Sequence, residues 1–211
     1  MSDPFSQESW DERYRSRSAL WSRNPNPQLV AEAGDLTPGT ALDVGAGEGA
    51  DAIWLASRGW HVTAVDLSAV ALERAAAHAS ESGPDIAARI DWVHEDVTSW
   101  NPGPGRYDLV SVQYVHLLPG PRQAMLARLE AAVAPGGTLL IVGHHPSDLE
   151  TSVPRPNVPG LLITADDMAA GLDRDRWTVI TSAAPGRTAT DPEGNQVTIH
   201  DAVLRAVRRA D

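Results

Sequence analysis

The sequence contains no cysteine, and all 17 of its basic residues are arginine. The absence of cysteine excludes disulfides, thiolate metal sites and cysteine nucleophiles. The absence of lysine excludes Schiff-base chemistry and the lysine of a P-loop. No apolar run approaches the roughly 20 residues that span a membrane, and the polar residues 1–16 contain no signal-peptide core. We therefore expect a cytoplasmic protein without a membrane partner.

Acidic residues outnumber basic ones by 28 to 17, which gives a formal net charge of −11. Nucleic-acid binders usually carry a basic patch, so the charge argues against a nucleic-acid partner. The 211 residues are enough for one domain with a substantial core. A hydrophobic content of 42% and a charged content of 21% are ordinary for a globular fold. The sequence leaves open whether the protein is a monomer or a homodimer.

Apolar strands alternate with helical segments along most of the chain. Strands are expected at 40–44, 61–67, 89–96, 107–116, 138–145, 176–183 and 196–208. Helices are expected at 7–18, from after Pro27 to about 33, and at 50–59, 68–82, 121–134 and 165–172. The pattern predicts an α/β fold, a doubly wound sheet with helices on both faces. The last two strands have no helix between them, which indicates an antiparallel hairpin at one edge.

The stretch ALDVGAGEGADA, residues 41–52, indicates a buried strand, a glycine-rich turn and the start of a helix. Its glycines follow a GxGxG spacing, which is neither the GxGxxG of dinucleotide folds nor a P-loop. Asp43 precedes the turn, and Glu48 lies within it, either as part of a site or facing solvent. Carboxylates suit a cation better than a pyrophosphate. We therefore expect a cationic ligand at the carboxyl ends of these strands.

Two further carboxylates follow the next strands. Asp66 ends the second strand, where a carboxylate can accept both hydroxyls of a ribose. Asp96 follows the third strand, and together with the backbone N–H of Val97 it is placed to read the edge of an adenine. The alternative for Asp96 is a helix cap. The set predicts a cationic adenosine ligand without phosphates, which S-adenosylmethionine fits.

The series LDVGAGEG, VTAVDLS, EDV and YDLV, followed by a PGG turn before a strand, resembles the class I S-adenosylmethionine-dependent methyltransferases. The resemblance runs from about residue 10 to 208. It implies a Rossmann-like, seven-stranded sheet, mostly parallel with an antiparallel last strand, and S-adenosyl-L-homocysteine as the product of the cofactor. The N-terminal WDERYRS…WSRNPNP is similar to the thiopurine and tellurite-resistance branch, in which this segment folds over the cofactor.

This resemblance divides the single domain, 1–211, into three parts and assigns its cofactor site. Residues 1–36 form a helical cover, 37–145 the cofactor-binding core, and 146–211 a loop, a short helix and the C-terminal hairpin. Trp21, with Trp10 beside it, lines the methionine or acceptor side unless both are ordinary core aromatics, and Arg23 is a candidate for a substrate anion. The residues expected to bind the cofactor are Asp43, Gly45, Ala46, Gly47, Gly49, Asp66, Leu67, Asp96, Val97, Gln113 and Trp21.

The tails of the fourth and fifth strands carry the candidate catalytic residues Tyr114, His116 and His145. Methyl transfer is an in-line displacement that depends mostly on positioning. A base helps when the nucleophile carries a proton at neutral pH, as a phenol or thiol does, and His116 or His145 is the candidate base. His144 points to the opposite face of its strand from His145, and we expect it to be a satisfied strand-end histidine. No metal site is predicted.

The sequence therefore predicts an S-adenosylmethionine-dependent methyltransferase of a small molecule, with a thiol, a chalcogen oxyanion or a phenol as favoured acceptor. The alternative within this class is an O- or N-methyltransferase that tailors a natural product. Outside it stand a non-catalytic nucleotide-binding protein and an NAD-dependent oxidoreductase. The proline-rich loop 146–160 is a candidate lid or pocket wall, or else an inert rim or dimer contact.

Overall fold

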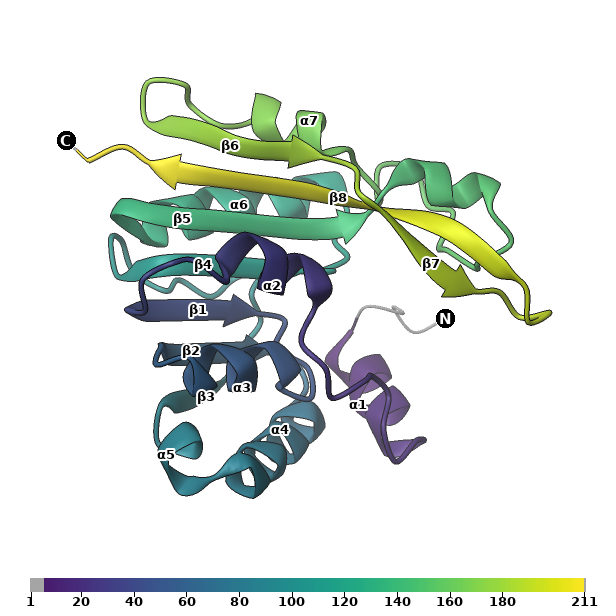
Figure 1. Cartoon of the computed structure of the whole chain (residues 1–211), viewed down its shortest axis with the longest axis horizontal. Coiled ribbons are helices and arrows are strands. Elements are labelled where there is room, and N and C mark those ends of the chain that lie inside the picture. Colours follow the sequence, from purple (N-terminus) through teal and green to yellow (C-terminus); the bar gives the residue numbers. More distant parts are fainter. Residues whose placement is uncertain (1–5, 211) are drawn as a thin grey trace.

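Eight strands form one sheet in residues 6–210, the part of the chain that this computed structural model describes (Figure 1). The order across the sheet is β3-β2-β1-β4-β5-β8-β6, and β7 pairs with β8 off this path. β1 to β5 run parallel, whereas β8 is antiparallel to β5, β6 and β7. The strands are Thr40–Val44 (β1), His61–Asp66 (β2), Ile90–His94 (β3), Tyr107–Gln113 (β4), Val133–His144 (β5), Trp177–Ala183 (β6), Gly186–Thr190 (β7) and Gln196–Arg208 (β8).

Helices cover both faces of this sheet, and Figure 1 shows α2 and α3 in front of it and α6 behind it. The helices are Gln7–Arg15 (α1), Pro27–Ala33 (α2), Ala50–Ser57 (α3), Ala69–Ser82 (α4), Pro84–Ala87 (α5), Pro119–Ala132 (α6) and Ala165–Ala170 (α7), with a 3-10 helix, η1, at Pro146–Glu150. The predicted α/β class, with a mostly parallel sheet and an antiparallel last strand, is confirmed.

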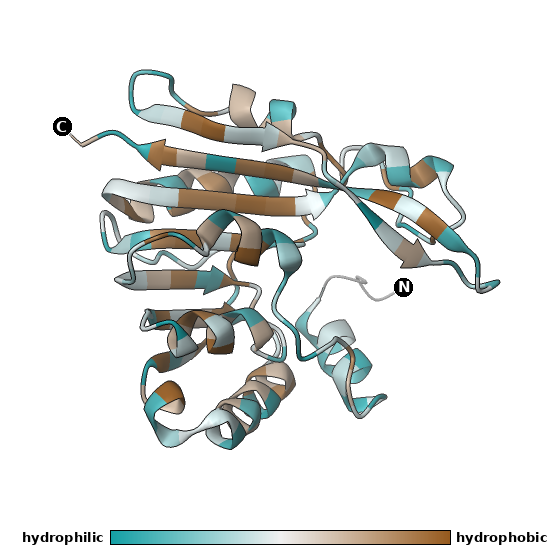
Figure 2. Cartoon of the chain, viewed as in Figure 1, coloured by the Kyte–Doolittle hydropathy of each residue, from teal (hydrophilic) through white to brown (hydrophobic). Residues whose placement is uncertain are grey.

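Two apolar cores form because successive side chains of a strand point to opposite faces. Leu42 and Val44 of β1 join the core that contains Met125 of α6 and Met168 of α7. Ala41 joins the core on the other face, together with residues of α2, α3 and α4. Figure 2 shows the apolar residues concentrated along the middle of β5 and β8. The sheet order reverses between β1 and β4, and ligands of such folds bind beyond the carboxyl ends of the strands at this point.

Three details of the elements differ from expectation. The seven expected strands form the main order of the sheet, and an eighth strand is added because residues 186–190 pair with the first five residues of the long strand β8. Residues 95–106, all of them described, contain turns but no helix, so β3 and β4 are joined without the predicted alternation. The helix expected at 121–134 begins at Pro119 and ends at Ala132, where β5 already starts.

Candidate functional site

The glycine-rich loop joins β1 to α3 at the switch point of the sheet. The backbone N–H groups of Gly45 and Ala46 both donate to the carbonyl of Val65 on β2, at 2.8 and 3.0 Å. Gly49 has a φ of 85°, and a Cβ atom there would lie 2.8 Å from the Cβ of Ala75. Only glycine combines this backbone conformation with so close an approach. The loop is therefore held tightly against β2 and α4.

One buried carboxylate, Asp43, and two partly buried ones, Asp51 and Asp66, surround the loop. Asp43 is the last residue but one of β1, with 1% of its surface exposed, and its Oδ2 has no hydrogen-bond partner within the described chain. Burial raises the pKa of Asp43, and the charges of Asp51 and Asp66 raise it further. Burial also raises the pKa of Asp51 to about 6 and that of Asp66 above its ordinary value. This excess of buried negative charge suits a cationic ligand.

Asp66 lies against the glycine loop. Its Oδ2 accepts a hydrogen bond from the N–H of Gly47, and its Oδ1 accepts one from the N–H of Ser68, both at 2.8 Å. Asp96 is exposed, and its Oδ1 accepts from the N–H and the hydroxyl of Thr98 at 2.8 and 2.7 Å. Asp96 thus caps a turn after β3. The other residues assigned to the cofactor also lie at strand ends of this edge or just beyond them: Leu67, Val97 and Gln113.

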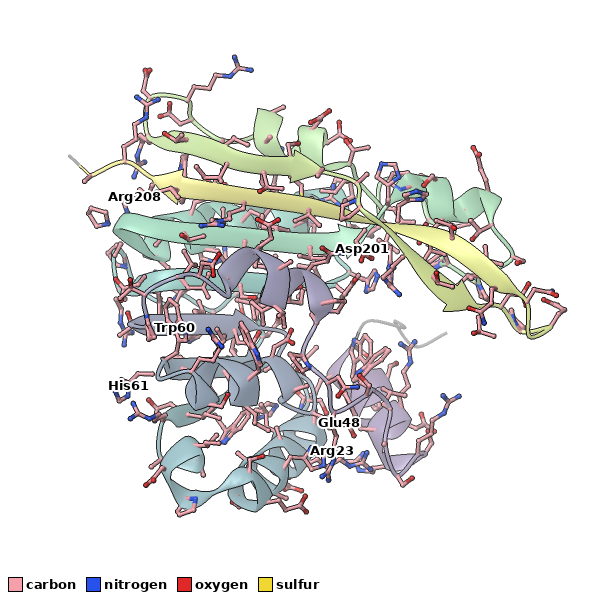
Figure 3. All side chains as sticks on the ribbon, viewed as in Figure 1. Arg23, Glu48, Trp60, His61, Asp201 and Arg208 are labelled. Carbon is pink, nitrogen blue, oxygen red and sulfur yellow. The ribbon has the colours of Figure 1, made fainter. Side chains whose placement is uncertain are left out.

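Glu48 binds the N-terminal segment to the loop (Figure 3). Its Oε2 accepts the backbone N–H groups of Leu20 and Trp21, each at 3.1 Å. Its Oε1 pairs with Arg74 of α4 at 2.9 Å, and Arg74 also donates to the carbonyl of Tyr14 at 2.6 Å. Glu48 is only 7% exposed, so of the two alternatives left open for it, facing solvent is excluded. The sequence contained no signal for this role.

The aromatic residues of the N-terminal segment lie against Gly47. The Trp21 indole N–H donates to the hydroxyl of Tyr14 at 3.0 Å. A Cβ atom on Gly47 would lie 3.1 Å from that hydroxyl oxygen and 3.6 Å from Cδ1 of Trp21. Trp10 lies farther out, with its ring centroid 6.2 Å from that of Tyr14. Arg23 pairs with Glu81 at the surface, at 2.8 Å, rather than with this group.

Tyr114 follows β4 and is the one non-glycine residue in 6–210 with a positive φ, 52°. This conformation is uncommon for a bulky side chain and is typical of functional sites. The Tyr114 hydroxyl donates to Asp201 of β8 at 2.8 Å. Burial and the neighbouring Asp201 raise the pKa of Tyr114. Tyr114 therefore stays protonated at neutral pH.

Asp201 connects four elements around this tyrosine (Figure 3). It is fully buried and lies opposite His144 in the register of β5 and β8. Besides the Tyr114 hydroxyl it accepts hydrogen bonds from Arg187 of β7 at 2.9 Å and from Gln28 of α2 at 3.2 Å. Sequence reasoning missed it, although a lone carboxylate in the apolar run of β8 was a usable signal, because a buried charge needs partners.

Of the two adjacent histidines at the end of β5, His145 has a hydrogen-bond partner and His144 lacks one, the reverse of what we expected. His145 caps η1, since its Nδ1 accepts from the N–H of Ser147 at 3.2 Å. His144 packs on His116, with 5.4 Å between ring centroids, and on Tyr114 at 4.5 Å. The Nδ1 of His144 is buried without a partner in the described chain. The expectation that His144 is a satisfied histidine was therefore wrong.

Both imidazoles of this pair are neutral at neutral pH. Burial lowers the pKa of His144 to about 3, and the charge of Arg155 contributes to the shift. Burial and Arg155 also lower the pKa of His116. Arg155 is held by the fully buried Asp148 through two hydrogen bonds of 3.2 Å. The loop 146–160 is thus anchored at this edge of the sheet.

A cavity of about 40 Å³ lies between the ends of β4 and β5 and the helices α6 and α7. Its volume holds a few water molecules at most. Arg122 donates to the carbonyls of Leu117, Gly160 and Leu161, at 3.3, 2.7 and 3.3 Å, and so fastens the chain segment beside the cavity. The cavity is lined by Val112, Tyr114, Val115, His116, Arg122, Met125, Leu126, Ile141, Val142, Gly143, His144, Leu161, Leu162, Ile163 and Met168.

Two kinds of feature are absent from the described part of the chain. No group of three or more histidine, aspartate or glutamate residues in 6–210 is arranged to hold a metal ion. No helix in the same range is long and apolar enough to cross a membrane.

Comparisons with known proteins bear on the family and the fold of the chain. Residues 41–137 match a family model described as a methyltransferase domain. The probable thiol methyltransferase 2 of Arabidopsis thaliana is 30% identical over 136 residues, which cover 62% of this chain and 59% of the relative. The chain thus spans about three fifths of the length of this relative.

Two solved structures share the fold over most of their length. One, described under the conversion of a disulfide bond into a thioacetal group during echinomycin biosynthesis, has a TM-score of 0.76 and 23% identity, and the match covers 96% of this chain and 92% of the other. The other is the 1,6-didemethyltoxoflavin-N1-methyltransferase of Burkholderia thailandensis with bound S-adenosylhomocysteine. It has a TM-score of 0.68 and 21% identity, and the match covers 100% of this chain and 92% of the other. Residues 41–137 thus match a methyltransferase domain, and the fold of the chain is that of the class I S-adenosylmethionine-dependent methyltransferases. The methyl donor of this family is S-adenosylmethionine, as the sequence predicts.

Proposed function

We propose that this protein transfers a methyl group from S-adenosylmethionine to a small, neutral acceptor with a dissociable proton, a thiol or a phenol. The observation that carries the donor side is the unpartnered, buried Oδ2 of Asp43 beside a glycine-rich loop with two more carboxylates. An ammonium group would neutralise this charge. The donor supplies an electrophilic methyl group bound to a sulfonium.

The residues that would hold the donor follow from their places around the loop. Asp43, Gly45 and Gly47 would hold its methionine end, with Trp21 beside them. Asp66 would accept the ribose hydroxyls, because a carboxylate has about four lone-pair sites and Asp66 uses two of them on backbone N–H groups. Asp96, through its second oxygen, and Val97 would contact the adenine.

The surroundings of the cavity favour a methyl acceptor without charge. Asp148 pairs with Arg155 and Asp201 pairs with Arg187, so two buried charges are already compensated. The imidazoles of His116 and His144, which line the cavity, are uncharged at neutral pH. An apolar thiol or phenol fits such surroundings better than an anion does. The name of the Arabidopsis relative, a thiol methyltransferase, agrees with this choice.

His116 is the proposed proton acceptor. As the nucleophile attacks, its S–H or O–H proton passes to the neutral imidazole of His116, and its electron pair forms the new bond to the methyl carbon. The electron pair of the broken carbon–sulfur bond stays with the sulfur of the donor. Tyr114 donates its own hydrogen bond to Asp201. It therefore positions the chain beside the cavity rather than taking a proton. His145 is a poorer base candidate, because its Nδ1 already caps η1.

The test is turnover with a panel of acceptors. The chain is incubated with S-adenosylmethionine and 2-phenylethanethiol, 4-ethylphenol, benzylamine, phenylacetate or tellurite, and S-adenosylhomocysteine is quantified. Formation that depends on the thiol or the phenol supports the proposal. Formation with benzylamine or phenylacetate alone would favour N- or carboxyl methylation. Binding of S-adenosylhomocysteine without turnover on any acceptor would favour a non-catalytic binding protein.

A further inference from the structure

One buried nitrogen beside the cavity has no partner. The side chain of His144 stands at the end of β5, and its Nδ1 makes no hydrogen bond within residues 6–210. Leaving such an atom buried and unpaired is unfavourable, because its hydration is lost without a replacement hydrogen bond. The cost indicates that a ligand supplies the missing partner in the working state of the protein.

The surroundings of His144 restrict what this partner can be. The cavity that it lines is otherwise walled by apolar side chains, among them Val112, Met125 and Ile141. The guanidinium of Arg122 is used on backbone carbonyls, and that of Arg155 on Asp148. The mostly apolar walls and the single unpartnered nitrogen fit an apolar ligand with one hydrogen-bonding group.

The chemistry of methyl transfer sets the direction of that hydrogen bond. A nucleophile must keep a lone pair for the methyl carbon, so its proton has to be directed at another acceptor. The lone pair of a neutral imidazole is such an acceptor. His144 is hard to protonate, since burial lowers its pKa to about 3. It therefore accepts a hydrogen bond from the nucleophile without taking the proton. The neighbouring imidazole of His116 lies 5.4 Å away, centroid to centroid.

We propose that His144 is a positioning residue for the acceptor: its Nδ1 accepts a hydrogen bond from the O–H or S–H of a neutral, apolar phenol or alkyl thiol bound in this cavity. The inference rests on the proposed function. During the reaction the proton turns from His144 to His116, which takes it as the oxygen or sulfur lone pair bonds to the methyl carbon. His144 then governs binding of the acceptor, and His116 governs the rate of transfer.

Entry of an aromatic ring requires the cavity to widen. The segment beside it is fastened by the three hydrogen bonds of Arg122 to Leu117, Gly160 and Leu161. An Arg122→Gln variant releases this segment while leaving both imidazoles in place. It should bind and release the acceptor faster than the wild-type chain does.

The experiment measures binding of 4-ethylphenol and of 4-ethylanisole to the protein saturated with S-adenosylhomocysteine. The two ligands differ in that 4-ethylanisole cannot donate a hydrogen bond. His144→Phe keeps a ring but removes the acceptor nitrogen. It should weaken the binding of 4-ethylphenol about tenfold and leave the affinity for 4-ethylanisole unchanged. His144→Asn places an oxygen near Nδ1 and should restore most of the loss. His61→Asn, the same change at an exposed histidine at the start of β2, is the control and should have no effect.

Turnover supplies the second readout. With 4-ethylphenol, His144→Phe should raise KM and leave kcat within about threefold, whereas His116→Gln should lower kcat. Equal losses for both ligands in His144→Phe, or no loss for either, would overturn the inference. So would a chain that binds S-adenosylhomocysteine but takes up no 4-ethylphenol. Failure to bind S-adenosylhomocysteine would instead count against the proposed function itself.

Discussion

The hydroxyl of Tyr114 donates to the carboxylate of Asp201 over 2.8 Å, which joins the tail of β4 to the buried middle of β8. Asp201 also binds Arg187 and Gln28, so one carboxylate connects the tail of β4, α2 and the two strands of the C-terminal hairpin. Tyr114 adopts a positive φ at this junction. The junction determines where the chain turns beside the cavity, and hence where His116 stands.

Tyr114→Phe should therefore reduce stability more than catalysis. Loss of the hydroxyl removes one hydrogen bond from a buried carboxylate, which we expect to cost about 1–3 kcal/mol of unfolding free energy in urea titrations. The kcat for a phenol should change by less than about threefold, because a general base would contribute about a hundredfold or more. A hundredfold fall in kcat with unchanged stability would show that Tyr114 takes the proton.

Binding of S-adenosylhomocysteine should weaken as the pH falls through about 6. Burial raises the pKa of Asp51 from the ordinary 3.8 to about 6, and the pKa of Asp43 is raised as well. Below these values the carboxylates gain protons, and an ammonium ligand must displace them, at up to about tenfold in affinity per pH unit for one proton. Calorimetry at pH 5 and 7.5, in buffers of different ionisation enthalpy, measures both the affinity and the proton release.

The variant Asp51→Asn sharpens this test. It keeps an oxygen for the N–H of Asn26, which donates to Asp51 at 2.6 Å, and it removes the charge that raises the pKa of Asp43. The loss of affinity should then move to lower pH. An affinity that is flat, or that rises on acidification, would contradict the assignment of these carboxylates to a cationic ligand.

Glu48→Gln should release the N-terminal cover. The variant weakens the acceptor for the N–H groups of Leu20 and Trp21 and breaks the ion pair with Arg74. Trypsin should then cut the arginine-rich segment 13–23 several-fold faster, and bound S-adenosylhomocysteine should protect it less. Glu81→Gln is the matched control, because it breaks only the exposed pair with Arg23. Equal cleavage rates for the two variants would mean that Glu48 does not hold the cover.

The kcat for a phenol at saturating cofactor should stay constant down to a pH below 6.5 and then fall. His116 has a lowered pKa, so it remains an unprotonated base to lower pH than an ordinary histidine. His116→Gln should lower kcat about a hundredfold and remove this acidic limb. Arg155→Gln should move the limb to higher pH, since Arg155 contributes to the shift. A pH profile that His116→Gln leaves unchanged would exclude His116 as the base.

The cofactor side of the site was largely predictable from the sequence. The glycine loop, Asp43 and Asp66 stand at ends of strands whose apolar runs are plain, and parallel strands bring their carboxyl ends to one edge. Trp21 was placed beside the loop by resemblance, and the structure puts its indole against Gly47. Backbone chemistry at this edge depends on local spacing, which a sequence carries directly.

The acceptor side depends on contacts between distant residues and was less predictable. Strand β7 is polar and partly exposed, so residues 186–190 showed no apolar alternation. Asp201 meets Gln28 across 173 residues of sequence, and Glu48 meets Leu20 across 28. Whether His144 or His145 lacks a partner depends on Ser147 and η1, which no periodicity revealed.

The measurement that tests the central claim most directly is a calorimetric titration with S-adenosylhomocysteine and with NAD. The account predicts micromolar binding of S-adenosylhomocysteine and none of NAD. It also predicts that Asp66→Ala lowers the affinity for S-adenosylhomocysteine at least about tenfold, because a charged partner of the ribose hydroxyls is removed. Asp91→Ala, which removes an exposed carboxylate on the neighbouring strand β3, should leave this affinity unchanged. Binding of NAD alone, or equal affinities for the wild type and Asp66→Ala, would contradict the account.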